Sequence, residues 1–319
     1  MFRRTLLAAG LAMPAIAEAQ AWPADRPIRV IVTFPPGGTV DTVARLLTPI
    51  MSERLGRTLV VENRGGASGV IGTEAIAKSA PDGHTIGFVL ATHAVNPALN
   101  PRLPYDTLQD FAPIGLVGGA PVLMAANNAS PFYSLADVIA AGRRRGQEPA
   151  YGTIGNGSTG HLTFSQLQTL SGATFLHTPF RGGGPAVQAA LAGTVPLVVA
   201  STVVVGPQVA SGHLRGICVS SAQRSPAHPD IPTIAESGFP GFSAESWVGV
   251  LAPARTPQAA VERLNAELNA ALATSEIRAR FASLGMTPQP MTPPQFGAFI
   301  AAEMERWGAV VRAHQITAD

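Results

Sequence analysis

The sequence is poor in cysteine and in charge, and each scarcity excludes classes of protein. Cys218 is the single cysteine among 319 residues, so no internal disulfide can form. It stands in the apolar run 214–219, which predicts a buried thiol. Charged residues make up 13% of the chain, and the formal net charge is +2. This near balance gives no electrostatic basis for binding nucleic acid or an anionic membrane.

Acidic residues are missing from a long internal stretch. No Asp or Glu occurs between Gly160 and Leu214. Just before it, residues 155–160 read Gly-Asn-Gly-Ser-Thr-Gly, but a dinucleotide site also needs an acidic residue about 20 positions further on. The segment is not a G-x-S-x-G nucleophile elbow either, because Asn156 stands where that motif needs glycine. A nucleotide-dependent α/β enzyme is therefore the weakest alternative.

The same region also lacks basic residues over most of its length. No charged residue lies between Arg181 and Arg215. Glycine and proline interrupt this stretch repeatedly, which a membrane-spanning helix would not tolerate. We predict a buried helix, strand and helix.

The seven histidines show no metal-ligand spacing. None lies four residues from another, and no cysteine cluster accompanies them. We interpret His161 and His177 as structural residues. No pair of carboxylates falls in the turns described below, so we predict no metal, no cofactor and no catalytic residue.

The N-terminus is organised like a secretory signal. Arginines at positions 3 and 4 precede an apolar run over 5–16, and small residues lead to a cleavage site after Ala21. The run is too short to span a bilayer. We predict that residues 1–21 are removed and that the mature chain is periplasmic. The route, Sec or twin-arginine, stays open.

Short β-branched runs alternate with glycine-rich turns and amphipathic helices. Residues 28–33 form an apolar run without alternation, and 40–55 carry apolar residues at helical spacing. Such alternation predicts mostly parallel sheets with right-handed crossovers. The pattern restarts in the middle of the chain, and a strand at 248–252 is expected to return to the first sheet.

This organisation predicts an α/β protein of two lobes. Residues 22–119 plus 228–319 would form a discontinuous first domain, and 120–227 the second. In open α/β sheets, ligands bind beyond the carboxyl ends of the strands.

Five turns are expected at that edge. They cover 35–39, 65–69, 92–96, 155–159 and 181–184. A helix N-terminus offers unpaired N–H groups and partial positive charge, so such turns bind an anion without a lysine. Short polar side chains that could donate to a carboxylate stand at Ser68, Thr92, Asn156, Ser158 and Thr159. Each turn alone is also typical of an ordinary connection between a strand and a helix. The prediction of ligand binding therefore depends on all five turns together.

Two charged residues flank the predicted cleft. Arg181 follows an expected strand and could pair with a carboxylate in bidentate fashion, although a surface or interlobe salt bridge is an equal alternative. Asp41 would repel an anion, so we assign it to fixing the first turn at the start of its helix.

Several ordered segments carry a family resemblance. They include Phe34-Pro-Pro-Gly-Gly-Thr-Val-Asp41 and Val61-Glu-Asn-Arg-Gly-Gly-Ala-Ser-Gly-Val-Ile-Gly72. Further segments lie at 22–32, 81–85, 96–99, 103–106, 155–162, 179–185 and 224–238. Through them the chain resembles the substrate-binding receptors of tripartite tricarboxylate transporters, also called Bug-type receptors, over essentially all of its mature length.

The resemblance implies a type II periplasmic-binding-protein fold, with two α/β lobes joined by two crossover segments that close on a carboxylated solute. Family members hold one carboxylate with backbone groups and ordered water from the first, second and fourth turns. The turns and the resemblance together predict ligand binding by Phe34, Gly37, Gly38, Thr39, Ala67, Ser68, Thr92, Asn156, Ser158, Thr159, Arg181, Gly182 and Ser201.

The chain departs from the family pattern in the distal half of this pocket. Thr194-Val195-Pro196 stands where Gln-Val-Asp is common, and Ala200-Ser201 where a polar pair such as Asp-Asn is frequent. His84 replaces the usual Tyr. The resemblance therefore does not identify the solute.

The sequence predicts an extracytoplasmic receptor that captures a small carboxylate by lobe closure. Its partners would be the solute and the membrane components of a tripartite transporter. A ligand-sensing receptor that feeds a signalling partner would use the same pocket, and the sequence does not separate the two. Neither role involves nucleic acid or insertion into a membrane.

Overall fold

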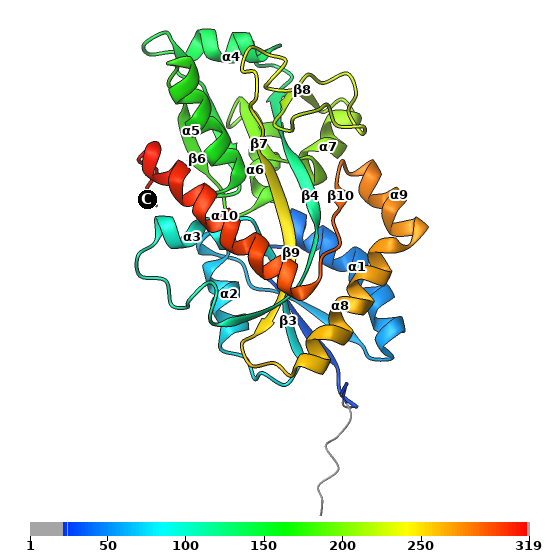
Figure 1. Cartoon of the computed structure of the whole chain (residues 1–319). Helices are drawn as coiled ribbons and strands as arrows, with labels where there is room; N and C mark the ends of the chain where they lie inside the picture. The colour runs from blue at the N-terminus through cyan, green and yellow to red at the C-terminus, as the bar shows by residue number, and fades with distance from the viewer. Residues whose placement is uncertain (1–21, 24, 318–319) are drawn as a thin grey trace, which may run out of the picture.

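Two groups of parallel strands, joined by two long antiparallel strands, form one sheet in the computed structural model (Figure 1). The structure describes residues 22–23 and 25–317, so the predicted signal peptide lies outside the described residues. The strands are β1 (Ile28–Val32), β2 (Leu59–Asn63), β3 (Thr85–Leu90), β4 (Phe111–Asn127), β5 (Ala150–Thr153), β6 (Leu176–Pro179), β7 (Leu197–Ser201), β8 (Leu214–Val219), β9 (Glu245–Pro253) and β10 (Thr287–Pro288).

The strand order explains the two lobes. β2, β1 and β3 are parallel neighbours in the first lobe, and β6, β5 and β7 are parallel neighbours in the second. Between them, β9 pairs antiparallel with β3 and β4, and β4 pairs antiparallel with β7. β8 and β10 also pair with β4. The predicted parallel sheet is confirmed within each lobe, and β9 returns to the first sheet as predicted.

β4 is an element that the sequence did not predict. Its several prolines and glycines ordinarily indicate turns. Register shifts beside Pro113 and Gly118 absorb this irregularity as bulges. Pro121 pairs with Glu245 of β9, whereas Val122 already pairs with β7. β4 therefore runs from one lobe into the other.

Helices connect and cover the strands. They are α1 (Thr39–Leu55), α2 (Val70–Ala77), α3 (Thr92–Leu99), α4 (Leu135–Gly142), α5 (Thr159–Ser171), α6 (Gly183–Leu191), α7 (Thr202–Ala210), α8 (Gln258–Ala273), α9 (Ser275–Ser283) and α10 (Pro293–Ala313). A 3-10 turn, η1 (Ala67–Gly69), precedes α2. α1 agrees with the helix predicted over 40–55 to within one residue.

The turn predicted at 92–96 is wrong. These residues form the first part of α3 and bury His93, Ala94 and Val95. The segment contains no glycine, and its small and apolar residues instead suit a helix packed against the first sheet.

α10 crosses from one lobe to the other (Figure 1). Phe296 near its start packs in a core cluster of the first lobe, and Trp307 near its end packs in a cluster of the second. Between them the Glu303 carboxylate accepts hydrogen bonds from Trp247 Nε1 at 3.0 Å and Trp307 Nε1 at 2.8 Å. A Cβ on Gly249 would lie 2.1 Å from Phe296 Cζ, so glycine in β9 admits the helix.

The predicted domain limits, 22–119 plus 228–319 and 120–227, stay predictions. Ile234 and Phe242 pack in the core of the second lobe. We therefore propose that the second crossover lies just before β9.

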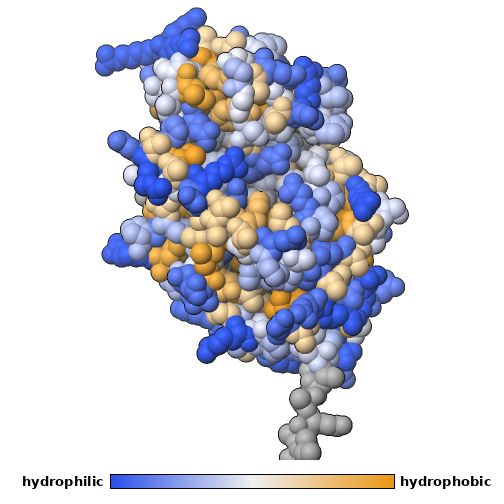
Figure 2. All heavy atoms as spheres, viewed as in Figure 1, coloured by the Kyte–Doolittle hydropathy of each residue, from blue (hydrophilic) through white to orange (hydrophobic). Residues whose placement is uncertain are grey.

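The chain's two unusual sequence features both lie in regular elements of the second lobe. The uncharged stretch after Arg181 forms α6, β7 and α7, as predicted. Cys218 is 1% exposed, and burial raises the pKa of its thiol to about 12. Polar residues are spread between apolar ones over the face that carries α10 (Figure 2). Within the described residues, no helix has both the length and the apolar character needed to cross a bilayer.

Candidate functional site

A buried carboxylate holds the turn that follows β1. Asp41 is 4% exposed and accepts a hydrogen bond from the Gly37 amide at 2.9 Å. Its other oxygen accepts from Asn63 Nδ2 at 2.8 Å and from Arg45 Nε at 2.9 Å. Asn63 also donates to the Phe34 carbonyl at 3.0 Å. This network fixes the turn and leaves the N-terminus of α1 without a side-chain cap.

The turn after β2 has an unusual backbone. Gly66, Ala67, Ser68 and Gly69 all have positive φ, at 132°, 47°, 51° and 91°. Non-glycine residues rarely adopt such angles, and those that do cluster at ligand sites. Among the described residues, the Ala67 and Ser68 amides have no protein acceptor. Consecutive free amides in a tight turn make a concave site for an anion.

Turns of the second lobe touch those of the first. Ser68 Oγ donates to the Asn156 carbonyl at 2.8 Å. A Cβ on Gly155, whose φ is +128°, would lie 2.9 Å from Ser68 Oγ. A Cβ on Gly182, whose φ is +116°, would lie 3.1 Å from Pro35 Cδ. Glycine is therefore needed where the lobes meet, for conformation and for space.

A cavity of about 170 Å³ lies between these turns. Five residues from the predicted binding set line it: Phe34, Ala67, Ser68, Asn156 and Arg181. No Asp or Glu contributes to its wall. Arg181 forms no ion pair within residues 25–317, so the salt-bridge alternative finds no partner there.

Other predicted residues stand beside the cavity without lining it. They are at the N-terminal ends of α1 and α6: Gly37, Gly38, Thr39 and Gly182. A Cβ on Gly38 would lie 3.9 Å from the Gly183 amide, so the two helix starts face each other across the lobes.

The remaining predicted residues lie at the starts of three further helices. Ser158 accepts from the His161 amide at 3.4 Å and caps α5, and Ser201 accepts from the Val203 amide at 3.3 Å and caps α7. Thr92 and Thr159 are buried first residues of α3 and α5. None of these four predicted residues lines the cavity.

Sequence reasoning missed the apolar part of the wall. The additional lining residues are Pro35, Gly66, Ile154, Gly155, Pro179 and Phe180. Polar donors within the turns give a signal in the sequence, whereas most of their apolar neighbours give none. Phe180 directly precedes Arg181, so an aromatic residue flanking a predicted turn was the available signal.

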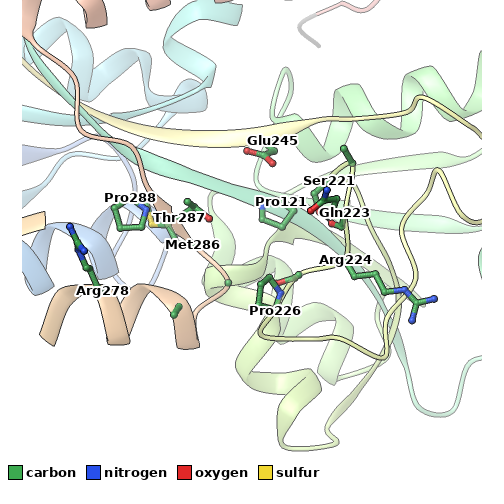
Figure 3. A pocket seen from close by; sticks show the side chains of 14 residues that line it. Pro121, Ser221, Gln223, Arg224, Pro226, Glu245, Arg278, Met286, Thr287 and Pro288 are labelled. Atoms are coloured by element: carbon green, nitrogen blue, oxygen red, sulfur yellow. Dashed lines mark hydrogen bonds between the residues drawn. The ribbon is translucent and has the colours of Figure 1, made fainter. Parts of the chain in front are cut away.

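A larger hollow, of about 550 Å³, opens where β4 and β9 pass between the lobes (Figure 3). Pro121, Glu245 and Arg278 line it, and Figure 3 shows Glu245 and Arg278 well separated within it. None of the predicted binding residues contributes. We place the candidate site in the smaller cavity, because the strained turn, the unpaired Arg181 and both lobes meet there.

The G-x-G-x-x-G segment serves close packing. A Cβ on Gly160 would lie 2.3 Å from the Val199 carbonyl oxygen, and one on Gly157 would lie 2.3 Å from Leu99 Cδ1. These glycines let α5 approach β7 and let the turn approach α3. Within the part of the chain that the structure describes, no group of three His, Cys, Asp or Glu is placed to hold a metal ion.

Comparison with known proteins places the chain in a family. The model of the tripartite tricarboxylate transporter family receptor matches residues 43–316. Protein BugT of Bordetella pertussis is 40% identical over 306 residues, covering 95% of this chain and 93% of BugT. The match extends over nearly the whole of both chains.

Solved structures share the fold. An R. palustris protein with adipate has a TM-score of 0.89 and 32% identity, covering 93% of this chain and 99% of that one. MatC from Rhodopseudomonas palustris with bound malate has a TM-score of 0.84 and 34% identity, covering 90% and 99%. The periplasmic binding protein BugD has a TM-score of 0.87 and 32% identity, covering 92% and 98%. The chain therefore belongs to the tripartite tricarboxylate transporter receptor family and has the periplasmic-binding-protein fold of the Bug-type receptors.

Proposed function

We propose that the chain is a periplasmic receptor that captures a small carboxylate between its lobes and delivers it to the membrane components of a tripartite transporter. The observation that carries the proposal is the interlobe cavity. Within residues 25–317 its wall offers two backbone amides without an acceptor and an Arg181 without an ion pair, but no carboxylate. Two relatives of known structure hold adipate and malate, which supports a carboxylated ligand.

The wall divides into parts that suit different portions of such a solute. The Ala67 and Ser68 amides would hold one carboxylate, aided by the partial positive charge at the starts of α1 and α6. Phe34 and Phe180 supply an apolar wall for a carbon chain. Arg181 would meet a second acidic group, because its guanidinium matches a carboxylate in two-pronged geometry.

The size of the cavity limits the solute. Its volume of about 170 Å³ equals the liquid volume of roughly five or six water molecules. That space is the size of a short carboxylate. In this proposal the solute leaves unchanged, and the chain contributes no catalytic group and needs no cofactor.

Capture would work by closure of the lobes. A solute that contacts turns from both lobes binds the closed arrangement better than the open one, and so shifts the population toward it. The bond from Ser68 Oγ to the Asn156 carbonyl joins the same two turns and favours the same arrangement.

A thermal-shift screen with malate, adipate and matched monocarboxylates tests the proposal. A ligand that binds only the folded chain raises its melting temperature by mass action. For a dicarboxylate that raises the melting temperature, we expect Arg181→Gln to lower affinity about tenfold or more, since hydrogen bonds to charged groups contribute about 1.5–3 kcal/mol. Uptake of that solute by cells that lack the chain then tests delivery.

Arg278→Gln, in the larger hollow, is the matched control. It should leave affinity unchanged. If it weakens binding while Arg181→Gln does not, the solute occupies the hollow beside β4 and β9, and the proposed site is wrong.

A further inference from the structure

The strained turn after β2, residues 66–69, bonds to each lobe through a different group of Ser68. The Ser68 carbonyl accepts a hydrogen bond from Asn96 Nδ2 at 3.3 Å. The Ser68 hydroxyl donates to the Asn156 carbonyl of the second-lobe turn, residues 155–158, at 2.8 Å. The first bond stays within the first lobe, whereas the second joins the two lobes. The second bond therefore breaks when the lobes open, and the first can persist.

Asn96 lies on a helix that is packed into the interior. α3 follows β3 of the first lobe after a single residue, and Asn96 is 4% exposed. On the same helix His93 and Ala94 are buried, and α10 packs against α3 (Figure 1). A side chain that is already ordered by its surroundings loses little freedom when it bonds. The Asn96 amide is therefore available to the Ser68 carbonyl before any ligand arrives.

The turn after β2 needs such a partner, because its backbone conformation is unfavourable. Ala67 and Ser68 have φ of 47° and 51°, in the left-handed region, and neither is glycine. An L residue in this region is disfavoured relative to the right-handed and extended conformations, so a turn without support relaxes toward those. The Ala67 and Ser68 amides, which we propose for the ligand carboxylate, would then no longer converge on one site.

α3 also touches the second-lobe turn. A Cβ on Gly157 would lie 2.3 Å from Leu99 Cδ1 and 3.2 Å from Val95 Cγ1. Val95 packs in the same core cluster as Phe164 of the second lobe. The helix that presents Asn96 to Ser68 therefore lies where the two turns meet.

We propose that Asn96 is a positioning residue, which holds the turn after β2 in its left-handed conformation in the open receptor before the solute binds. Asn96 does not line the cavity, so it acts through Ser68 and not by contact with the solute. The inference rests on the proposed function for its effect on binding. A turn that is already arranged does not have to be ordered by the ligand, so a larger fraction of the receptors is competent at each encounter.

The test separates the association rate from the dissociation rate. Asn96→Ala removes the donor, and we expect the association rate constant for malate or adipate, whichever the wild type binds, to fall about threefold to tenfold. The dissociation rate constant should change by less than about twofold, because the bound solute and the Ser68–Asn156 bond hold the turn in the closed complex. Arg181→Gln should show the opposite pattern, since the loss of a direct contact acts mainly on dissociation. Stopped-flow measurements give both constants.

Two further variants control for packing and for stability. Asn96→Leu keeps most of the side-chain volume without the donor, and should match Asn96→Ala. Asn265→Ala removes another buried asparagine of the first lobe, whose Nδ2 donates to the Ile114 and Met291 carbonyls at 2.7 and 2.8 Å. Asn265 does not line the cavity, so its loss should lower the unfolding free energy and leave both rate constants unchanged.

A second measurement needs no ligand. The backbone ¹³C and ¹⁵N chemical shifts of Ala67 and Ser68 depend on φ, so they report whether the turn keeps its left-handed conformation. We expect these shifts to move toward extended or right-handed values in Asn96→Ala and in Asn96→Leu. In Asn265→Ala they should keep their wild-type values.

The two proposals fail in different ways. If no carboxylate binds the wild type, the proposed function fails, while the chemical shifts still decide whether Asn96 holds the turn. The inference is overturned if either the shifts or the association rate of both Asn96 variants match the wild type. It is also overturned if their loss of affinity lies in dissociation alone, or if Asn265→Ala slows association equally. Circular dichroism of each variant separates loss of the turn from loss of the fold.

Discussion

In the first lobe the turn that we propose to bind the ligand is held by a carboxylate, and in the second lobe two imidazoles lie against the corresponding turn. Asp41 holds the first-lobe turn and is balanced by Arg45. In the second lobe, His161 Nδ1 accepts from the Gly157 amide and Thr153 Oγ1 accepts from the Gly155 amide, and His177 contacts Thr153. In both lobes side-chain acceptors orient backbone N–H groups.

The difference shows how an anion site can be built beside an acid. In the first lobe, Asp41 is saturated by Gly37, Asn63 and Arg45, so its charge is largely compensated before a ligand arrives. The second lobe contains no acid between Gly160 and Leu214, and the acceptors for its turn amides are His161 Nδ1 and Thr153 Oγ1.

The largest effect that we expect is the loss of stability in acid that the buried His93 of the first lobe causes. Burial lowers the pKa of His93 in the first lobe to about 4, partly opposed by a backbone interaction with Thr107. The unfolded chain takes up this proton near pH 6.5. The contribution of His93 to the unfolding free energy is therefore fully present above about pH 6.5. It decreases by on the order of 3 kcal/mol as the pH falls toward 4.

Urea unfolding at pH 7.5, 5.5 and 4.5 measures this loss. His93→Phe should reduce the dependence of the unfolding free energy on pH without removing it, because the pKa of His177 is also lowered and this residue contributes over the same pH range. Hydrogen bonds from Arg29 and Arg64 lower the pKa of the Glu62 carboxyl to about 2. Protonation of Glu62 therefore reduces the unfolding free energy only below this pH range. If His93→Phe keeps the wild-type dependence of the unfolding free energy on pH, His93 does not cause this loss.

The next effect removes the carboxylate support of the first turn. Asp41→Ala leaves the Gly37 amide and the Asn63 side chain without their acceptor. We expect ligand affinity to fall about tenfold to a hundredfold, since hydrogen bonds to charged groups contribute about 1.5–3 kcal/mol. Titration calorimetry measures it, and the loss should change little between pH 7.5 and pH 5.

Asp106→Ala is the matched control for Asp41. Asp106 also accepts backbone amides in the first lobe, from Leu108 and Gln109 at 2.8 Å each, but it does not line the cavity. Its loss should lower stability slightly and leave affinity intact. Equal losses of affinity in the two variants would mean that Asp41 acts through global stability alone.

The parts of the fold that the sequence predicted are those with local signals. α1 and the three C-terminal helices have periodic apolar faces, and the turns carry glycines at positive φ. β4 has no such local signal, because its prolines and glycines are compatible with a strand only when β9 pairs with it. A strand that joins two lobes is stabilised by partners distant in sequence.

For the site, the sequence indicated the turns but not their roles. Ser158 and Ser201 look like ligand donors in a glycine-rich turn, yet their hydroxyls cap helices. Phe180 has no polar signal and lines the cavity. His161 and His177 are 16 positions apart, and only the pairing of β5 with β6 brings the second of them onto the turn. Which face a side chain presents is set by tertiary packing, which single residues do not encode.

The smallest effect that we expect distinguishes a cap beside the cavity from a cap far from it. Ser158 caps α5 and Ser134 caps α4, and both are in the second lobe. Loss of either hydroxyl should lower the unfolding free energy by about 1 kcal/mol, a typical value for an N-cap. Only Ser158→Ala should also lower ligand affinity, by a few-fold, because its cap holds the end of α5 from which His161 supports the turn. Matched unfolding and binding measurements on Ser158→Ala and Ser134→Ala decide the point. If both variants bind like wild type, the turn is held by its imidazoles alone, and the contrast between the lobes becomes sharper.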